Sequence, residues 1–245
     1  MFVAEGIEVV RTGLLAGAVP ESLYVASGAA DADGGVAEVV SLANAVGARI
    51  FELAPGVVER VSSTVTPQPV LAIFPALDLP SVPEEADLVV VLADVRDPGN
   101  AGTVLRTADA SGAGAVVCCG GTVDPYNPKT VRASAGSLFH VPVVLAGEPV
   151  ALLETLGASG LRRLGAVARG GQDYAGVDWS VRTALVLGNE AWGLPEGLVL
   201  DGLVGIPMSG RAESLNVGMA CAVLCFEALR QRRSGPGRRR STMPG

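Results

Sequence analysis

The chain has 245 residues, of which 49% are hydrophobic and 18% are charged. This composition supports a sizeable core and excludes disorder for all but the chain ends. No apolar run reaches the roughly 18 residues that cross a bilayer, and no basic-then-apolar leader opens the chain, so we expect a soluble, cytoplasmic protein without a membrane partner.

The basic residues are unevenly spread over a chain whose net charge is −7. Six of the eighteen lysines and arginines lie in the last sixteen positions, which leaves the rest of the chain near −13. A polyanionic partner must therefore be bound by this arginine-rich end or by a local patch, because the remaining charge repels it.

Residues 1–78 contain short apolar segments, in which helical periodicity alternates with strand periodicity. We expect helices at 6–16, 36–46 and 55–61 and strands at 23–25, 49–53 and 70–74. The following segment, 75–87, carries three prolines and four acidic residues with little periodicity, which is typical of an exposed linker. The pattern predicts a small α/β domain over residues 1–78 and a linker over 79–87.

Longer elements follow the linker. Strands are expected at 88–93, 115–119, 141–145, 164–168, 184–187 and 203–207, and helices at 101–111, 128–134, 150–158 and 212–232. Continuous apolar strands separated by helices predict an α/β domain at 88–233, with a mostly parallel sheet covered on both faces. The last helix is expected to bury a stripe through Leu215, Met219 and Val223, beside Ala220 and Leu224. Residues 234–245 are expected to form a disordered basic tail.

The cysteines and the histidine do not indicate a metal site. Cys118 and Cys119 are adjacent, and Cys221 and Cys225 are four residues apart on an apolar helix, which matches neither zinc spacing nor a disulfide framework. We expect all four to be buried as small hydrophobic residues. His140 is the only histidine, which argues against a Ser-His-Asp triad and against a histidine-rich metal centre.

Three polar loops follow predicted strands, at 94–100, 188–197 and 207–216, where ligands bind in parallel sheets. The chain lacks the GxxxxGK[ST] phosphate loop and the GxGxxG dinucleotide fingerprint. Asn100 is expected to cap a helix that begins at Ala101, with Arg106 on its second turn. A capped helix with an exposed arginine explains that pattern equally well, and Glu190 could equally be a solvated loop residue.

Read together, the loops carry a family pattern. The segments DPGNAGTVLRTADASGA (97–113), LVLGNEAWGL (185–194) and IPMSGRAESLNVGMACAV (206–223) resemble, in order and spacing, the three motifs of the SpoU (TrmH) family of RNA ribose methyltransferases in the SPOUT superfamily. Residues 129–143 resemble the family's segment between the first two motifs. Residues 3–17 and 62–74 resemble the small substrate-binding domain that precedes the catalytic domain in many members.

This resemblance implies a fold and an activity. The sheet of 88–233 would end in a C-terminal trefoil knot that binds S-adenosylmethionine, and the protein would be a homodimer that needs no metal. It would methylate a ribose 2′-hydroxyl in RNA, with 23S rRNA favoured by the two-domain layout. The alternatives are a tRNA ribose methyltransferase, a base methyltransferase, and a non-catalytic RNA-binding or ribosome-assembly protein of the same fold.

The resemblance also implies roles for individual residues. The catalytic polar set would be Asn100, Arg106 and Glu190, with Ser214 and Asn216 shaping the methyl-transfer pocket. The donor would be held, mainly by backbone, around Leu187, Gly188, Ile206, Met208 and Leu215. Arg132 and Ser134 would lie near the RNA. Glycine at 188 suits close approach of backbone to a ligand, and Gly218 stands where many members have serine.

Arg106 is the residue whose chemistry matters most to this hypothesis. A literal base is unattractive because an arginine stays protonated in proteins. We expect it to clamp the adjacent phosphate and to stabilise the alkoxide that develops as the hydroxyl attacks. RNA contacts would come from the first domain, Arg132 and the arginine tail.

Overall fold

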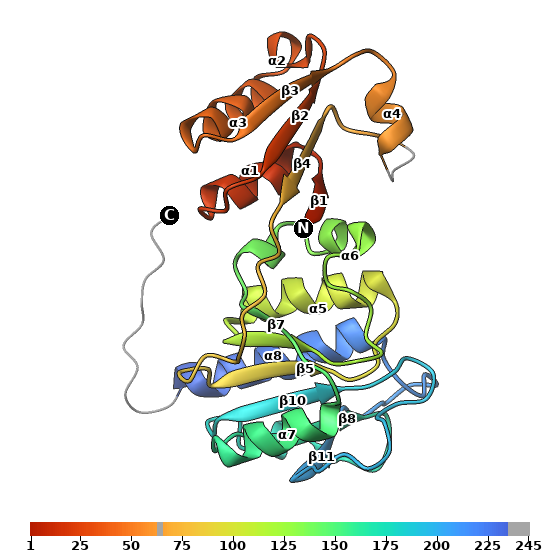
Figure 1. The fold of residues 1–245 in the computed structure, drawn as a ribbon. Helices are drawn as coiled ribbons and strands as arrows, with labels where there is room; N and C mark the ends of the chain where they lie inside the picture. The colour runs from red at the N-terminus through yellow and green to blue at the C-terminus, as the bar shows by residue number, and fades with distance from the viewer. Residues whose placement is uncertain (63–65, 235–245) are drawn as a thin grey trace.

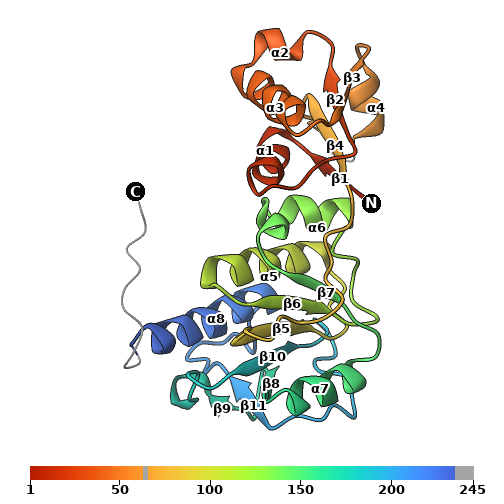
Figure 2. The ribbon, with the colours of Figure 1, turned by 60° about the vertical axis from the view of Figure 1, so that its left-hand side comes forward.

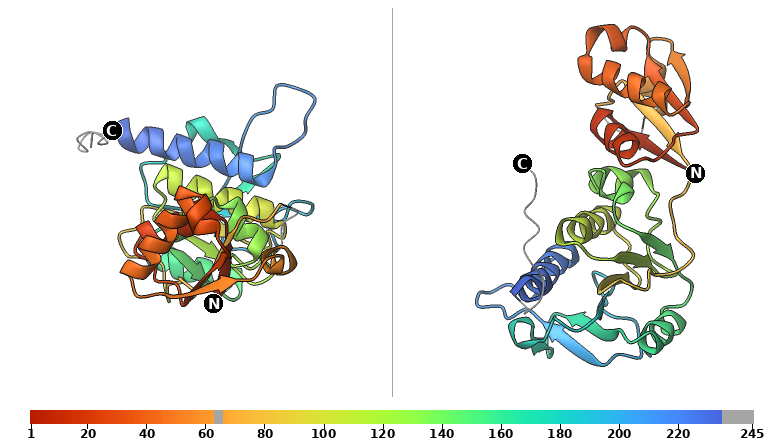
Figure 3. Two further views of the ribbon diagram at one scale, coloured as in Figure 1. Left: turned by 90° about the horizontal axis from the view of Figure 1, so that it is seen from above. Right: turned by 90° about the vertical axis from the view of Figure 1, so that its left-hand side faces the viewer.

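The computed structural model describes residues 1–62 and 66–234, which contain two β-sheets (Figure 1). The first is four-stranded, in the order β1-β4-β2-β3, and the second is seven-stranded, in the order β7-β6-β5-β10-β8-β11-β9. The two sheets belong to separate lobes that lie end to end, so the molecule is elongated (Figure 3, right).

The first lobe is a mixed sheet with helices packed on it. Its strands are β1 (Phe2–Glu5), β2 (Ser22–Ala26), β3 (Arg49–Leu53) and β4 (Val70–Phe74), and its helices are α1 (Ile7–Leu15), α2 (Ala29–Ala32), α3 (Gly34–Ala45) and α4 (Val57–Val61). β2 pairs with β3 in parallel, whereas β4 is antiparallel to both β1 and β2. The predicted elements are all present. β1 and α2, each four residues long, were not predicted, because such short segments carry too few positions to show a period.

The segment that connects the lobes, 79–87, makes contacts that an exposed linker would lack. Most of its residues are exposed, as expected, but the backbone N–H of Leu79 donates to the carbonyl of Val143 at the edge of the second sheet (2.7 Å). An aromatic cluster joins the lobes beside it: the rings of Phe2 and Tyr126 are 4.9 Å apart, and those of Phe74 and Phe139 are also 4.9 Å apart. The lobes therefore share apolar contacts as well as a chain segment.

The second sheet is parallel throughout, which confirms the predicted architecture. Its strands are β5 (Leu88–Leu92), β6 (Ala115–Cys118), β7 (Val143–Leu145), β8 (Arg162–Val167), β9 (Gln172–Asp173), β10 (Thr183–Leu187) and β11 (Gly202–Gly205). Every residue of the adjacent central strands β5 and β10 is buried. Apolar side chains on both faces of these strands explain why their sequences show a continuous run rather than alternation.

Helices cover both faces of this sheet (Figure 2). On one face lie α5 (Pro98–Ser111), α6 (Pro128–Ala133) and α8 (Val217–Ser234), and on the other lies α7 (Pro149–Ala158). Two short 3-10 turns, η1 (Ser137–Phe139) and η2 (Tyr174–Gly176), complete the described elements.

Alternate residues of β5 contribute to different apolar layers. Val89 and Val91 lie in the layer that contains Leu153 and Leu156 of α7. Val90, between them in the chain, belongs to the layer on the opposite face, because successive side chains of a strand point to opposite sides. Two separate apolar layers therefore enclose the sheet.

The predicted start of α5 was wrong. The helix begins at Pro98, and the side chain of Asp97, not of Asn100, caps it by accepting a hydrogen bond from the backbone N–H of Asn100 (2.8 Å). Proline suits the first helical position because its missing N–H would have no partner there, and aspartate is a preferred cap. The side chain of Asn100 is thereby released for other contacts.

The predicted start of α8 was also wrong. The helix begins at Val217, so residues 206–216 form a loop, and the side chain of Asn216 accepts hydrogen bonds from the backbone N–H groups of Gly218 (2.9 Å) and Met219 (3.3 Å). A Cβ atom on Gly218 would lie 2.7 Å from Cγ2 of Thr103, which shows how closely α8 approaches α5. The glycine at 218 thus has a packing reason of its own.

The buried face of α8 also differs from the apolar stripe predicted for it. The buried positions are Gly218, Cys221, Leu224, Cys225 and Ala228, so only Leu224 of the predicted stripe is fully buried. Met219 (62% exposed) and Phe226 (47% exposed) lie on a second, solvent-facing apolar side.

Other expectations concern the cysteines, the chain end and membranes. All four cysteines are buried, as predicted. Of the tail expected at 234–245, only Ser234 falls within the described residues, where it ends α8. In the parts of the chain that the structure describes, no helix has the length and apolar character to cross a bilayer.

Candidate active site

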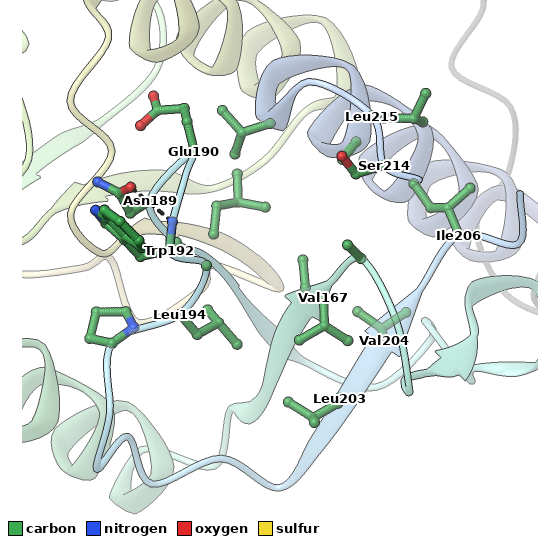
Figure 4. Close-up of a pocket in the computed structure, with 18 of the residues that line it drawn as sticks. Val167, Asn189, Glu190, Trp192, Leu194, Leu203, Val204, Ile206, Ser214 and Leu215 are labelled. Atoms are coloured by element: carbon green, nitrogen blue, oxygen red, sulfur yellow. Dashed lines mark hydrogen bonds between the residues drawn. The ribbon is translucent and has the colours of Figure 1, made fainter. Parts of the chain in front are cut away.

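A pocket of about 850 Å³ opens at the carboxyl ends of β8, β10 and β11 (Figure 4). One wall is the loop after β10, the floor comes from β8 and β11, and the opposite wall is the loop that leads into α8. Eight of the residues predicted from the sequence line it: Leu187, Gly188, Glu190, Ile206, Met208, Ser214, Leu215 and Asn216. The second and third loops therefore converge on one pocket.

The pocket's apolar lining comes mainly from two strands and the loop ahead of α8. Val167 at the end of β8 and Leu203 and Val204 of β11 line the pocket from below, and Ile206, just beyond β11, lines the side next to α8 (Figure 4). A pocket of this size with apolar walls and a few polar groups is typical of a small-molecule site. A second cavity of about 490 Å³ adjoins it and shares Ala168, Ile206 and Met208.

The loop after β10 turns back sharply on itself. The backbone N–H of Asn189 donates to the carbonyl of Gly193 (2.8 Å), and the N–H of Gly193 donates back to Asn189 (2.9 Å). A Cβ atom on Gly188 would lie 2.3 Å from the carbonyl oxygen of Gly193. Glycine is therefore required at 188 by the protein's own backbone, whereas the sequence had suggested approach to a ligand.

The side chain of Asn189 ties this loop to the loop after β5. Its Nδ2 donates to the backbone carbonyl of Asp94 (3.0 Å) and to the Asp94 carboxylate (3.1 Å). Asp94 has a φ of 69°, in the left-handed region that few non-glycine residues adopt, and its carboxylate also accepts from Nε of Arg96 (2.8 Å). Sequence reasoning assigned no role to Asp94 or Asn189, although both closely follow buried strands.

Glu190 is the point where the first and second loops meet. Its carboxylate accepts hydrogen bonds from the backbone N–H groups of Arg96 (3.2 Å) and Asp97 (3.1 Å) and from Nδ2 of Asn100 (2.9 Å). Partial burial alone would raise the pKa of Glu190, but the hydrogen bonds from Asn100 and the two backbone groups outweigh it and lower the pKa. Glu190 is consequently a carboxylate at neutral pH and a weak base.

Asn100 connects this carboxylate to α8. Its Oδ1 accepts a hydrogen bond from Nδ2 of Asn216 (2.7 Å), and Asn216 in turn caps α8. Glu190, Asn100 and Asn216 therefore form one hydrogen-bonded chain across the three predicted loops. Glu190 orients the amide of Asn100, and the backbone N–H groups at the start of α8 orient the amide of Asn216, so the two ends of the chain agree on one arrangement.

Arg106 lies apart from this chain. It is exposed on α5 and does not line the pocket. Among the residues that the structure describes, its guanidinium has no hydrogen bond or ion pair. The sequence therefore placed Arg106 on the correct helix, and its donors remain available to a ligand outside this chain.

The two residues expected near RNA, Arg132 and Ser134, differ in their exposure to solvent. Arg132 is exposed on α6. Ser134 is fully buried, and its hydroxyl donates to the carbonyl of Val131 (2.7 Å), so this side chain does not face the surface, and its place near RNA stays a prediction. Ser134 is buried because the end of α6 packs between α5 and β1, which no local sequence pattern reveals.

The sequence of this chain is similar to those of known proteins. The model of the SpoU rRNA Methylase family matches residues 87–226. A 23S rRNA (guanosine(2553)-2'-O)-methyltransferase of Bacillus subtilis is 38% identical over 186 residues, covering 74% of this chain and 72% of its own length. A 23S rRNA (uridine(2479)-2'-O)-methyltransferase of Streptomyces viridochromogenes is 39% identical over 170 residues, covering 66% of this chain and 59% of its own.

Solved structures resemble this one over both lobes. The AdoMet-bound rRNA methyltransferase from Sinorhizobium meliloti superimposes with a TM-score of 0.81 at 34% identity, covering 94% of this chain and 87% of that one. The SpoU methyltransferase AviRb from Streptomyces viridochromogenes, in complex with the cofactor AdoMet, gives 0.82 at 29% identity, covering 96% and 91%. The similarity thus includes the first lobe, which lies outside the matched family model.

Proposed function

The chain belongs to the SpoU rRNA methylase family, and we propose that it is an enzyme that transfers the methyl group of S-adenosylmethionine to a ribose 2′-hydroxyl of 23S rRNA. The observation that carries this proposal is the pocket in which eight predicted residues converge beside the hydrogen-bonded chain of Glu190, Asn100 and Asn216. Relatives named as 23S rRNA 2′-O-methyltransferases support the substrate class.

The pocket fits a nucleoside-sized donor. Its volume of about 850 Å³ lies within the range of small-molecule sites, and its lining combines apolar side chains with a few polar groups. Leu187 and Gly188 would hold the donor through backbone groups, and Ile206, Met208 and Leu215 would supply apolar contacts to its adenine. When bound there, S-adenosylmethionine supplies an electrophilic methyl group on a sulfonium.

The polar chain would organise the acceptor side. In the transfer, the ribose oxygen would gain the methyl group as the carbon–sulfur bond breaks, S-adenosylhomocysteine would leave, and the hydroxyl proton would pass to solvent. Glu190, held as a carboxylate by its three donors, orients the amide of Asn100 rather than taking that proton. Ser214, on the opposite wall, would help to position the oxygen and the methyl group in line, which is the main source of acceleration in such a transfer.

Arg106 would contribute charge. Its exposed guanidinium, without a partner among the described residues, is suited to clamp the phosphate next to the target ribose and to stabilise the developing alkoxide.

RNA binding would be divided between the lobes. We assign residues 1–78 to a small RNA substrate-binding domain, 79–87 to the connection and 88–233 to the methyltransferase domain. Residues 1–78 carry nine acidic residues and three arginines, a net charge of −6. This charge opposes non-specific attraction to phosphates, so the first lobe would recognise RNA through local contacts, with Arg132 and the arginine-rich end supplying cationic ones.

The same family membership supports a trefoil knot and a homodimer. β11 pairs with β8, and the segment that follows, 206–216, lines the same pocket as the loop after β10 before α8 packs on α5. We infer that this segment is threaded through that loop. The exposed Met219 and Phe226 on α8 would meet a second copy of the chain, and an enzyme of ribosomal RNA would act in the cytoplasm.

The proposal is tested by supplying methyl-labelled S-adenosylmethionine with purified 23S rRNA, 16S rRNA and tRNA, and digesting the products to nucleosides. We expect label in a 2′-O-methylated nucleoside from 23S rRNA. Label in tRNA would favour the tRNA alternative, and label on a base would make the protein a base methyltransferase. A protein that does not bind the donor in calorimetry and labels no RNA would be the non-catalytic alternative.

A further inference from the structure

Trp192 is a tryptophan that the fold leaves in solvent. Its exposure is 85%, the highest among the large hydrophobic residues that the structure describes, whereas the second tryptophan of the chain, Trp179, is fully buried. A single exposed apolar residue is common on protein surfaces and requires no function by itself. Two further observations, the support beneath the ring and its position, distinguish this residue.

The backbone that carries Trp192 is held rigidly. The Oδ1 atom of Asn189 accepts hydrogen bonds from the N–H groups of Ala191 (2.9 Å) and Trp192 (3.2 Å). Asn189 and Gly193 exchange two backbone hydrogen bonds, and Nδ2 of Asn189 is bound to Asp94. The ring therefore projects from a turn that the protein's own hydrogen bonds hold in place, which lowers the cost of ordering the loop for a partner that stacks on the ring.

The position of the ring is at the mouth of the donor pocket. Figure 4 shows Trp192 beside Asn189 on the wall formed by the loop after β10, across from Ser214 and Leu215. It lies two residues from Glu190, which binds the amide of Asn100. Arg96 is nearby, because its backbone N–H donates to Glu190, and its own side chain is 68% exposed. The ring thus stands on the same short loop as Glu190, and that loop is bound to the backbone of Arg96, whose side chain is ion-paired with Asp94 (2.8 Å).

We propose that Trp192 stacks on an unpaired base of the RNA substrate, next to the ribose that is methylated. The inference rests on the proposed function and names a specificity contact for it. Sequence-specific recognition of RNA mostly targets unpaired nucleotides, and proteins hold the splayed bases of such nucleotides by stacking them on aromatic rings. The ring at the mouth of this pocket is at the place where that base would lie.

The contrast between the two tryptophans provides a direct assay. Acrylamide quenches the fluorescence of exposed Trp192 but reaches buried Trp179 poorly. We expect 23S rRNA, added with S-adenosylhomocysteine, to reduce the quenching of Trp192 fluorescence by acrylamide. In Trp192→Phe, the RNA should no longer change the quenching. Protection by S-adenosylhomocysteine alone would mean that the ring covers the donor, and protection that follows protein concentration would mean that it meets a second copy. Either result overturns the proposal.

Kinetics give the second test. Stacking on one base predicts that Trp192→Ala raises KM for RNA by about 5- to 150-fold, that Trp192→Phe recovers most of this loss, and that the Kd of S-adenosylmethionine changes by less than about threefold. Val181→Ala is the matched control, because Val181 is an exposed apolar residue (42%) just ahead of β10, at the opposite end of that strand. An unchanged KM in Trp192→Ala, with the wild type active, refutes this inference alone; a wild type that methylates no RNA refutes the proposed function itself.

Discussion

Replacement of Glu190 by glutamine tests whether this carboxylate organises the acceptor side. The two carboxylate oxygens together accept three hydrogen bonds, from Arg96, Asp97 and Asn100. Glutamine has one acceptor oxygen, so its amide nitrogen must face at least one of these donors. A hydrogen bond to a charged group contributes about 1.5–3 kcal/mol, which solvent screening at this partly exposed site reduces to about 1–2 kcal/mol.

This loss has a kinetic consequence because the amide of Asn100 is oriented by Glu190. At about 1.36 kcal/mol per tenfold change in rate, we expect kcat for RNA methylation to fall roughly 5- to 30-fold in Glu190→Gln. Single-turnover methylation with labelled donor measures it, and Glu196→Gln, an exposed glutamate on the same loop, is the control. A rate within twofold of the wild type would refute the positioning role. A loss beyond a thousandfold would instead indicate a base.

Three further predictions concern charge, packing and pH. Arg106→Ala should lower turnover about 10²–10³-fold with donor binding retained in calorimetry, and a loss under tenfold would contradict the clamp. Gly188→Ala should destabilise the protein by about 1–3 kcal/mol and weaken donor binding, whereas Gly210→Ala, which has open space, should not; equal melting temperatures would contradict this. Hydrogen bonds from Arg163 lower the pKa of Asp201 to about 2, below about 3.9 for an unfolded aspartate, so this pair stabilises the fold above about pH 4 and is lost as pH falls towards 2. Asp201→Asn should remove that dependence in urea titrations, and an unchanged pH profile would contradict it.

The sheet and the convergence of its loops could be predicted from the sequence. The continuous apolar runs at β5 and β10 indicate strands buried on both faces, and the carboxyl ends of parallel strands lie at one edge. This is why Glu190 and Ser214 line one pocket although they are far apart in the chain.

The contacts within the site could not be predicted in the same way. Asn100 is 90 residues from Glu190 and 116 from Asn216, and their hydrogen bonds depend on the order in which β5, β10 and β8 adjoin and on how closely α8 approaches α5. The burial of Ser134 likewise depends on packing between two lobes. The cap of α5, by contrast, could have been predicted from the sequence. Aspartate followed by proline at 97–98 is a local signal for the start of a helix.

A map of ribose methylation in RNA from cells with and without the gene for this chain would show whether the protein methylates 23S rRNA. We predict one 2′-O-methylated position in 23S rRNA that is present with the gene, disappears without it, and returns when the wild-type gene is restored but not when Arg106→Ala is supplied. Identical ribose-methylation maps in both strains, under conditions in which the protein is produced, would contradict the account.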